Sequence, residues 1–448
     1  MLVNWRDKNI LVLGMGVSGK ALSAFLQSQG LCFFIHDDNE SKRDLALKEY
    51  KNSKPWALEQ DKVDLVLYSP GIPLSNPSIQ FLKAQGAELL TEVAFALAIL
   101  KGRVKKIVGI TGTNGKSTTT TMLSHVFNQQ EIPSLACGNI GVPVTDLLSH
   151  KSLPEYLFVE LSSYQLEGLN FPCLDAAIMT NLAEDHLDRY QSFSSYIDAK
   201  LNIVKALKDK APFFVEDQAV LLFPSNFEYE ELHLFGLKES SYLCYSQRDG
   251  RIHQDKVDYI LKEEYRNNFL RSRLNALAAL CFWTFAKMEI ESFFLHLNSF
   301  SCLEHRLESL GFFDGVEIIN DSKATNVASV LYAMESLPGD IVLIVGGRAK
   351  GESFKAWLPY LKTKVSVVFA LGEAKEKISK DLNFCDKIVK VKDLKEALDR
   401  SVESARKGNK VLLSPGCSSF DMFEDYQERG NVFKSLVREL TCEGKDES

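Results

Sequence analysis

The sequence lacks the features that would place it in or across a membrane. No run of 18 apolar residues occurs among its 448 residues, so no membrane-spanning helix is expected. The first residues, Met1 to Asp7, are too polar to form the apolar core of a signal peptide. The 9 cysteines are scattered without any C-x-x-C pair, and we therefore expect reduced thiols and a cytoplasmic protein.

A basic surplus is missing too. The 52 Lys and Arg residues are outnumbered by 59 Asp and Glu residues, giving a net charge of −7, which argues against a nucleic-acid partner. The 8 histidines form no H-E-x-x-H motif or other clustered ligand pattern. A hydrophobic share of 45% and a charged share of 25% are ordinary for a globular protein, and the length allows two to four domains.

What the sequence does contain is three successive blocks of alternating strands and helices. The expected strands are residues 9–13, 31–35, 105–110, 156–160, 176–181, 316–320, 341–345, 365–371, 387–391 and 411–414, with helices after the glycine loops and over 193–207 and 394–406. Such alternation predicts an α/β fold of parallel sheets covered on both faces. Boundaries near Leu100 and Leu303 predict three domains, residues 1–100, 101–303 and 304–448.

The strongest single signal is the loop after the strand at 105–110. It reads Gly112-Thr113-Asn114-Gly115-Lys116-Ser117-Thr118 and precedes a helix. Glycines let backbone N–H groups turn toward phosphate oxygens, the lysine reaches the β- and γ-phosphates, and the hydroxyls can ligate Mg²⁺. The usual spacing would put a glycine at position 110, where this chain has Ile110, so the loop is a variant. The alternative, a glycine turn with an exposed lysine, is disfavoured by the four small or polar residues and the strand and helix around them.

A second glycine loop, Gly14-x-Gly16-x-x-Gly19, follows the first strand. Asp37 stands about twenty residues further on, at the distance where an acid meets a ribose in dinucleotide-binding domains. Alone, this pattern is weak and leaves NAD, another nucleotide or a simple tight turn open.

Three residues of the middle block are candidates for metal chemistry. Glu160 ends a strand beside the phosphate loop, where a carboxylate can bind Mg²⁺. His186 could bind a metal or orient a substrate, and Lys200 lies on the helix expected over 193–207. The plain alternatives are a solvated edge carboxylate, a loop histidine and a surface lysine, and the local pattern does not overturn them.

Taken together, these residues resemble the Mur ligase family of ATP-dependent amino-acid ligases. The matching stretches run in family order over nearly the whole chain: GITGTNGKST from Gly109, ELSSYQLE from Glu160, TNLAEDHLDRY from Thr180, NALAAL from Asn275, EHRLE from Glu304 and NDSKATN from Asn320. The GMGVSG loop, the NDSKATN segment and LLSPGCSSFDMFEDYQERGNVF from Leu412 are most similar to the members that add D-glutamate to UDP-N-acetylmuramoyl-L-alanine in peptidoglycan precursor synthesis.

The resemblance implies a fold of three domains and a role for each. A Rossmann-like N-terminal domain would bind the UDP substrate, a central P-loop ATPase-like domain would bind ATP and two Mg²⁺ ions, and a Rossmann-like C-terminal domain would bind the amino acid. The implied UDP-substrate residues are Val17, Ser18, Asp37, Ser69, Gly71, Asn139 and Ser162; the ATP residues are Gly112 to Thr118, Asn275, Arg306 and Asp321; the metal ligands are Ser117, Glu160, His186 and Lys200; and the D-glutamate residues are Thr325, Lys350, Ser419, Phe420 and Tyr426.

The resemblance also implies the chemistry. Lys116, His186 and Lys200 would be catalytic, and Lys200 would carry a carbamate that binds the second metal. ATP would convert the substrate carboxylate into an acyl phosphate, which the D-glutamate amine then attacks. The expected partners are these small molecules alone, with no nucleic acid and no membrane, and the protein is expected to be a monomer.

The chain departs from the family pattern in places. Arg271 and Ser272 stand where His and Asn are usual, which bears on the adenine contacts, and Tyr426 replaces a usual Phe. Arg348 lies two residues before Lys350, where an acid or a small residue is expected, and the sequence offers no reason for it.

Three competing functions remain open at this level. A folylpolyglutamate synthase-like ligase is disfavoured by the full first domain, and a P-loop nucleotide switch is disfavoured by the segments around His186, Lys200 and Arg306. An NAD-dependent oxidoreductase would rest on the first glycine loop alone.

Overall fold

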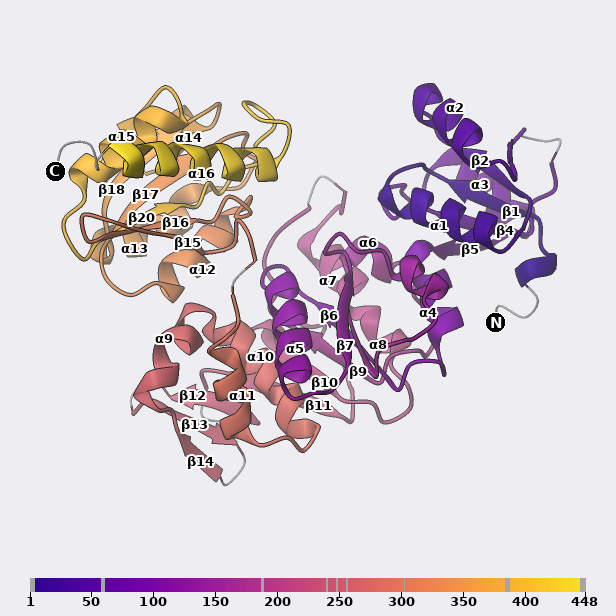
Figure 1. Ribbon diagram of the computed structural model, residues 1–448, viewed down its shortest axis with the longest axis horizontal. Helices are drawn as coiled ribbons and strands as arrows, with labels where there is room; N and C mark the ends of the chain where they lie inside the picture. Colours follow the sequence, from indigo (N-terminus) through magenta and orange to yellow (C-terminus); the bar gives the residue numbers. More distant parts are fainter. Residues whose placement is uncertain are drawn as a thin grey trace. The chain divides into compact units, whose positions relative to one another are not determined.

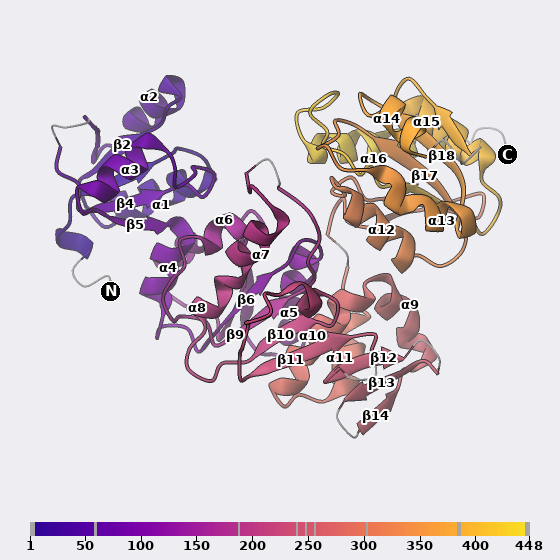
Figure 2. The same ribbon diagram turned by 180° about the vertical axis from the view of Figure 1, so that it is seen from behind.

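The computed structural model describes residues 5–57, 61–186, 189–238, 241–246, 249–254, 257–301, 303–382 and 387–443. The chain divides into two compact units, residues 1–265 with 274–300, and residues 266–273 with 301–448. The first unit contains two sheets and the second contains one, and all three can be followed in Figure 1 and, from behind, in Figure 2.

The first sheet has five parallel strands in the order β3-β2-β1-β4-β5. The strands are β1 (Ile10–Leu13), β2 (Phe33–His36), β3 (Ser53–Pro55), β4 (Leu65–Tyr68) and β5 (Glu88–Thr91), with helices η1 (Trp5–Asp7), α1 (Val17–Ser28), α2 (Glu40–Glu49) and α3 (Pro77–Ala84). Every residue of β1 and β4 is buried, as expected for central parallel strands covered on both faces.

The second sheet has nine strands in the order β14-β13-β12-β11-β10-β9-β6-β8-β7. Its strands are β6 (Lys106–Thr111), β7 (Ser134–Gly138), β8 (Tyr156–Glu160), β9 (Ala176–Met179), β10 (Phe213–Glu216), β11 (Leu232–Gly236), β12 (Leu243–Ser246), β13 (Arg251–Gln254) and β14 (Val257–Ile260). Its helices are α4 (Glu92–Leu100), α5 (Lys116–Gln129), η2 (Val144–Ser149), α6 (Ser163–Leu166), α7 (Phe193–Leu201), α8 (Ile203–Ala206), η3 (Ala219–Leu222), α10 (Arg273–Phe285) and α11 (Ile290–Leu297). Most of the residues of α9 (Glu263–Arg271) belong to the second unit.

Helix α4 connects the first sheet to the second and is buried over most of its length. Phe95 of this helix packs against Trp5 and Phe25, and one continuous hydrophobic core runs from the first sheet into the second. At the start of the helix, the Glu92 carboxylate accepts hydrogen bonds from the backbone N–H and the hydroxyl of Thr145, both at 2.7 Å. Burial raises the pKa of Glu92.

The second sheet differs from the sequence expectation in two respects. The pattern predicts only parallel pairing, but β12, β13 and β14 pair antiparallel at the sheet edge. The single helix predicted over 193–207 is two helices, α7 and α8, with a break at Asn202. Asparagine is a weak helix former because its side chain competes for hydrogen bonds, and here the Asn202 amide oxygen accepts one from Lys205 Nζ at 2.7 Å.

The second unit is built on a six-stranded sheet in the order β15-β16-β20-β17-β18-β19, in which only β15 runs antiparallel. Its elements are β15 (Glu308–Phe313), β16 (Val316–Asn320), α12 (Val327–Ser336), β17 (Ile341–Gly346), η4 (Phe354–Trp357), α13 (Leu358–Thr363), β18 (Val365–Leu371), α14 (Lys375–Asp381), β19 (Ile388–Lys390), α15 (Leu394–Ser404), β20 (Lys410–Leu413) and α16 (Tyr426–Glu443).

Two separate hydrophobic cores lie on the two faces of this sheet. One includes residues of α12, α13 and α14, and the other includes residues of α15 and α16. This confirms the prediction of an α/β domain with both faces covered.

None of the helices in the described part of the chain combines the length and the hydrophobicity of a membrane-spanning segment.

Candidate nucleotide and metal site

The sheet order brings the sequence-predicted site residues of the middle block to one edge. Strand β6 lies between β8 and β9, and all three run parallel. Their carboxyl ends therefore lie at the same edge of the sheet. After β8 the chain crosses β6 and forms β9 on its other side, and α/β sheets bind ligands where the strand order reverses in this way. The phosphate loop follows β6, Glu160 ends β8, and Thr180 and Asn181 follow β9.

The phosphate loop depends on glycine at two positions. Gly112 has φ +138°, and a Cβ there would lie 2.0 Å from the Thr180 hydroxyl. Gly115 has φ +79°, and a Cβ there would lie 2.1 Å from Asn275 Oδ1. Ile110, at the position where the usual motif has glycine, is fully buried inside β6, which continues to Thr111.

The loop is anchored to the end of β9. The Asn114 N–H donates to Asn181 Oδ1 at 2.8 Å, and Asn181 Nδ2 donates to Asn114 O at 3.0 Å. The Thr180 hydroxyl donates to Asn114 O at 2.6 Å. Sequence reasoning placed Thr180 and Asn181 within a family segment but gave them no role. Their hydrogen bonds hold the loop in a fixed conformation, which lowers the cost of ordering it around a ligand.

Lys116 opens helix α5 directly after the loop. Its Nζ donates to Gly112 O at 3.0 Å and to Thr113 O at 2.8 Å, so the ammonium lies over the loop backbone. The start of α5 adds the positive end of a helix dipole to this charge. The arrangement suits a phosphate group.

Ser117 and Glu160 are buried beside the loop and hydrogen-bonded to each other, and the exposed Asn139 bonds to the same carboxylate. The Ser117 hydroxyl donates to Glu160 Oε2 at 2.5 Å, and Asn139 Nδ2 donates to Glu160 Oε1 at 2.9 Å. Glu160 is 2% exposed, so the reading of it as a solvated edge carboxylate is wrong. A serine hydroxyl next to a carboxylate is an oxygen donor pair of the kind that Mg²⁺ uses together with phosphates.

Lys200 reaches the same loop from α7. Its side chain is buried, its Nζ donates to Gly112 O at 2.7 Å, and it lies 4.7 Å from the centre of the Tyr196 ring. The reading of Lys200 as a surface lysine is therefore wrong. The pKa of the Lys200 amine lies well below its ordinary range, mainly because the amine is buried and secondly because of the charge of Lys116.

His186 lies on the loop that follows β9, with φ +55°. Its backbone N–H donates to Asp185 Oδ1 at 2.9 Å. In the ring, Nδ1 is 2.9 Å from the Tyr164 hydroxyl and Nε2 is 3.7 Å from Asp185 Oδ2. Tyr164 and Asp185 lie in the quoted family segments, yet their contact with the histidine could not be read from the sequence. Among the described residues, no group of three or more His, Cys, Asp or Glu side chains could hold a metal by itself.

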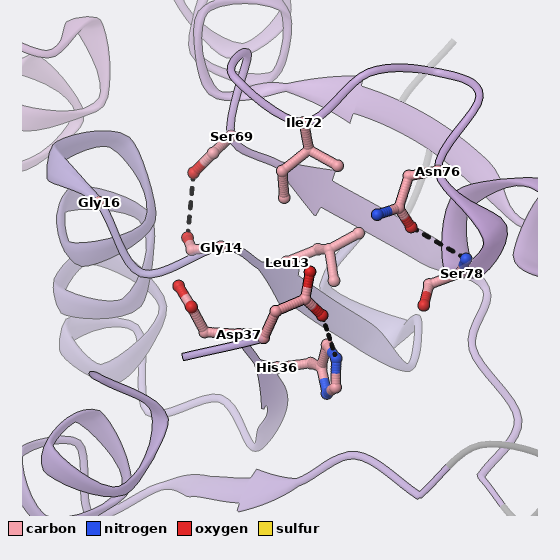
Figure 3. Close-up of a pocket in the computed structure, with 10 residues that line it drawn as sticks. Leu13, Gly14, Gly16, His36, Asp37, Ser69, Ile72, Asn76 and Ser78 are labelled. Atoms are coloured by element: carbon pink, nitrogen blue, oxygen red, sulfur yellow. Dashed lines mark hydrogen bonds and ion pairs between the residues drawn. The ribbon is translucent and has the colours of Figure 1, made fainter. Parts of the chain in front are cut away.

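The first glycine loop borders a separate cavity of about 210 Å³ in the first sheet, drawn in Figure 3. Its lining residues are Leu13, Gly14, Gly16, His36, Asp37, Asp38, Ser69, Ile72, Asn76 and Ser78. Figure 3 shows the Ser69 hydroxyl bonded to Gly14 O, at 3.0 Å. Of the predicted UDP-substrate residues, Asp37 and Ser69 line this cavity, whereas Val17, Ser18 and Gly71 lie outside its lining.

Asp37 supports the glycine loop itself. Its Oδ2 accepts from Met15 N at 2.6 Å and its Oδ1 from Asn39 N at 2.8 Å. Gly19 is required for close packing, because a Cβ there would lie 1.9 Å from Gly14 O. Ser162, predicted to touch the substrate, forms a capping box with Gln165 at the start of α6.

Of the predicted residues in the second unit, Asp321 and Thr325 follow β16, Lys350 follows β17, Ser419 and Phe420 follow β20, Arg306 precedes β15, and Tyr426 opens α16. Asp321 follows β16 and is buried, accepting from Ser414 Oγ at 2.8 Å and from Leu307 N at 3.2 Å. Burial raises the pKa of Asp321 to about 7. The other predicted residues here are Arg306, Thr325, Lys350, Ser419, Phe420 and Tyr426.

Among these, Ser419 is buried, and Lys350 and Phe420 are exposed. The segments that carry them are joined, because Arg348 N donates to Ser418 O at 2.9 Å and Ser418 N donates to Arg348 O at 3.0 Å. Tyr426 lies under Lys323, whose Nζ is 3.7 Å from the ring centre.

The structure explains one departure from the family pattern and adds a residue that sequence reasoning missed. Arg348 forms a bidentate ion pair with Glu373, in which Nε lies 3.0 Å from Oε2 and Nη2 lies 3.0 Å from Oε1.

Arg429 is 1% exposed and donates to the carbonyl and the hydroxyl of Ser322. Burial lowers the pKa of Arg429 to about 10. Ser272 is buried, and the side chain of Arg271 lies outside the described residues.

Comparison with known protein families matches the chain in three consecutive parts. Residues 8–91 match the Mur ligase MurD-like N-terminal domain, residues 110–276 the Mur ligase middle domain, and residues 305–417 the Mur ligase glutamate ligase domain. The matched order is the order of the three sheets along the chain.

Similar proteins extend over the full length. The chain is 33% identical to a UDP-N-acetylmuramoylalanine–D-glutamate ligase of Protochlamydia amoebophila, over 98% of this chain and 99% of that protein. It is 35% identical to the protein of that name from Chlamydia pneumoniae, over 97% of this chain and 99% of that protein. Among solved structures, MurF ligase from Thermotoga maritima in complex with ADP shares the fold, with a TM-score of 0.63 at 15% identity over 91% of this chain and 95% of that chain.

Proposed function

Since the chain belongs to the Mur ligase family, we propose that it joins D-glutamate to UDP-N-acetylmuramoyl-L-alanine at the expense of ATP, a step of peptidoglycan precursor synthesis. The reaction is an ATP-dependent amide-bond formation. We propose that residues 1–100 bind the UDP substrate, residues 101–303 bind ATP and Mg²⁺, and residues 304–448 bind the amino acid.

One observation carries the proposal at the level of the site. The Nζ atoms of Lys116 and Lys200 both donate to the same oxygen, Gly112 O, next to the start of helix α5. The Lys116 ammonium at the start of the helix, beside loop glycines that admit no side chain, supports an anionic ligand such as the phosphates of ATP. The hydroxyl and carboxylate of Ser117 and Glu160 supply oxygen donors that suit Mg²⁺.

The chain's residues deal with a specific electrostatic problem. The substrate carboxylate must attack the γ-phosphate, so two anions must approach each other. When bound, Mg²⁺ ions supply positive charge that the attacking and leaving oxygens share. Lys116 adds its ammonium, whose backbone carbonyl partners phosphate oxygens can replace. ADP leaves as the acyl phosphate forms. The D-glutamate amine then attacks the acyl carbon and loses a proton, phosphate leaves as the amide forms, and the same positive charges stabilise the oxyanion between these steps.

Lys200 has the properties that carbamate formation requires. A protonated amine cannot attack CO₂, and burial together with Lys116 favours the neutral form of Lys200. Addition of CO₂ to the amine forms a nitrogen–carbon bond and releases one proton, leaving an anion with two oxygens. We propose that this carbamate holds the second Mg²⁺, because a hard cation prefers such oxygens.

The remaining site assignments are part of the same proposal. Lys350 and Ser419 bind the carboxylates of D-glutamate, with Thr325, Phe420 and Tyr426 around them, and Arg306 and Asp321 contribute to the ATP site. Asn275, which packs against Gly115 of the phosphate loop, supports the nucleotide. We propose that the enzyme is cytoplasmic and a monomer, and light scattering tests the oligomeric state.

The test is ADP release from ATP in the presence of UDP-N-acetylmuramoyl-L-alanine and one amino acid at a time. D-glutamate should give stoichiometric ADP and a product heavier by one glutamyl residue in mass spectrometry. L-glutamate, meso-diaminopimelate and lysine should give little. Efficient product formation with diaminopimelate or lysine would assign the chain to a different specificity within the family, and ADP release without any amide product would reject the ligase function.

A further inference from the structure

A tyrosine that the proposed mechanism does not use lies directly against the proposed metal ligand His186. The Tyr164 hydroxyl is 2.9 Å from His186 Nδ1, and the two ring centroids are 5.1 Å apart. Tyr164 sits on the short helix α6, immediately after β8 and the carboxylate of Glu160. The metal-site segments that follow β8 and β9 are thus joined by a contact between two side chains.

If one ring nitrogen of His186 binds a cation through its lone pair, only the other nitrogen can carry the proton. That proton then needs an acceptor. A neutral imidazole carries its proton on one nitrogen and presents a lone pair on the other. Nδ1 faces the Tyr164 hydroxyl, whereas Nε2 belongs to a side chain that is 40% exposed and has the Asp185 carboxylate 3.7 Å away. Nε2 is therefore the nitrogen in reach of a cation, and the proton belongs on Nδ1.

We propose that Tyr164 is a positioning residue for His186: its phenolic oxygen accepts the Nδ1–H and so fixes both the tautomer and the direction in which Nε2 points. This inference rests on the proposed function, in which His186 binds a divalent cation. The partner of a metal-binding histidine controls both the orientation and the basicity of the ring, and its loss typically weakens metal binding by about 10–100-fold.

The tyrosine is itself held in place by a second layer of contacts. The Arg189 guanidinium lies 4.1 Å from the centre of the Tyr164 ring, and Arg189 Nη2 bonds to Glu167 Oε2 at 3.0 Å. Tyr190 donates to the other oxygen of Glu167 at 2.7 Å. The arginine and the glutamate side chains are 16% and 18% exposed, so this ion pair is shielded from bulk water. The Arg189 guanidinium packs on the face of the Tyr164 ring and so limits the positions that the ring can take.

The same arginine reaches the first sheet. Arg189 Nη1 lies 3.3 Å from both Pro70 O and Gly71 O, in the turn that follows β4 and the cavity residue Ser69. The tyrosine that orients the metal ligand is therefore held by a residue that also contacts the segment predicted to bind the UDP substrate.

The decisive variant is Tyr164→Phe, which removes only the hydroxyl and keeps the ring under Arg189. The first readout is the Kd of Mn²⁺ for the full chain, measured by titration calorimetry in the presence of a non-hydrolysable ATP analogue. The analogue prevents turnover. We expect roughly tenfold weaker Mn²⁺ binding in Tyr164→Phe. Tyr229→Phe is the matched control, because it removes a phenolic hydrogen bond to Ala211 O elsewhere in the same unit and should bind Mn²⁺ like the unmodified protein.

The second readout is the tautomer of His186 in the metal-free protein, observed by nitrogen NMR of ¹⁵N-histidine-labelled protein at about pH 8.5, where imidazole is neutral. The signal is assigned by its loss in His186→Gln. We expect the Nδ1–H form in the unmodified protein and in Tyr229→Phe, and a shift toward Nε2–H in Tyr164→Phe. A purely structural role of Tyr164 would not change this signal.

The inference is overturned if Tyr164→Phe keeps both the Mn²⁺ affinity and the Nδ1–H form, or if the unmodified protein already has the proton on Nε2. Neither outcome touches the proposed function, which is measured separately as amide formation by the unmodified protein. Conversely, failure of that assay would reject the ligase, while the tautomer measurement would still decide the hydrogen bond.

Discussion

Asp321→Asn should make the second unit more stable above neutral pH while it impairs the enzyme. Asp321 is 7% exposed, and burial raises the pKa of its carboxyl to about 7, from an ordinary value of 3.8. At about 1.36 kcal/mol for each pH unit, the ionised side chain costs the folded state up to about 4 kcal/mol above pH 7. The amide has no charge to bury and can still accept from Leu307 N and pair with the Ser414 hydroxyl.

The sign of the pH dependence follows from proton binding. Between about pH 4 and pH 7 the folded state holds a proton on Asp321 that the unfolded state has lost, so this group makes stability fall as pH rises. The benefit of Asp321→Asn should therefore be small near pH 4, grow through this window and level off above pH 7. We expect a gain of roughly 1–4 kcal/mol at pH 8, since part of the cost is relieved by relaxation of the site.

The assay must follow the second unit alone, because burial also raises the pKa of Glu216 in the first unit to about 7. Hydrogen exchange of peptides from β16 and β20, measured in increasing urea and corrected for intrinsic rates, isolates the second unit. His305 in the same unit has a pKa lowered by burial, which acts in the opposite direction, but it cancels in the difference between variant and unmodified protein. Asp340→Asn, at an exposed position, is the control.

The reasoning is refuted if Asp321→Asn changes stability by the same amount at pH 5 and pH 8, or if it destabilises the second unit at pH 8. The first result would mean that Asp321 does not exchange a proton in this window, and the second that its charge is compensated by nearby arginines. In either case turnover is measured in parallel, and we expect it to fall, because the carboxylate is proposed to serve the ATP site.

Three further predictions concern the proposed reaction. Lys116→Ala should abolish turnover without changing the thermal unfolding midpoint by more than a few degrees, and activity near that of the unmodified protein at saturating ATP would contradict the phosphate-loop assignment. Lys200→Ala should lose roughly 100-fold or more in kcat, acetate should restore part of it, and a crystal grown near neutral pH should show a carboxyl group on the amine; unimpaired turnover would contradict the carbamate. Lys350→Ala should raise the KM for D-glutamate through loss of a charge-assisted bond of roughly 1.5–3 kcal/mol, about tenfold or more, with the KM for ATP unchanged; an effect on both would place Lys350 elsewhere.

The sequence by itself determined the three α/β blocks and the phosphate loop. Strand, glycine loop and helix follow one another within about thirty residues, so local periodicity and the need for glycine are visible without a fold. The strands at 156–160, 316–320 and 365–371 have the predicted bounds in the structure. The resemblance to the family likewise assigned Glu160, His186 and Lys200 to one metal site, which stays a prediction.

Only the tertiary structure decided which of the plain readings of these residues was wrong. A lysine on a helix is a surface residue by default, and Lys200 became a buried amine only because α7 packs its side chain against the phosphate loop, 88 residues away in the chain. The same holds for Tyr164 and His186, whose contact depends on the sheet order, in which β8 and β9 flank β6 and end at the same edge. Burial, pKa and hydrogen-bond partners are set by neighbours that are distant in sequence, and a single sequence does not record them.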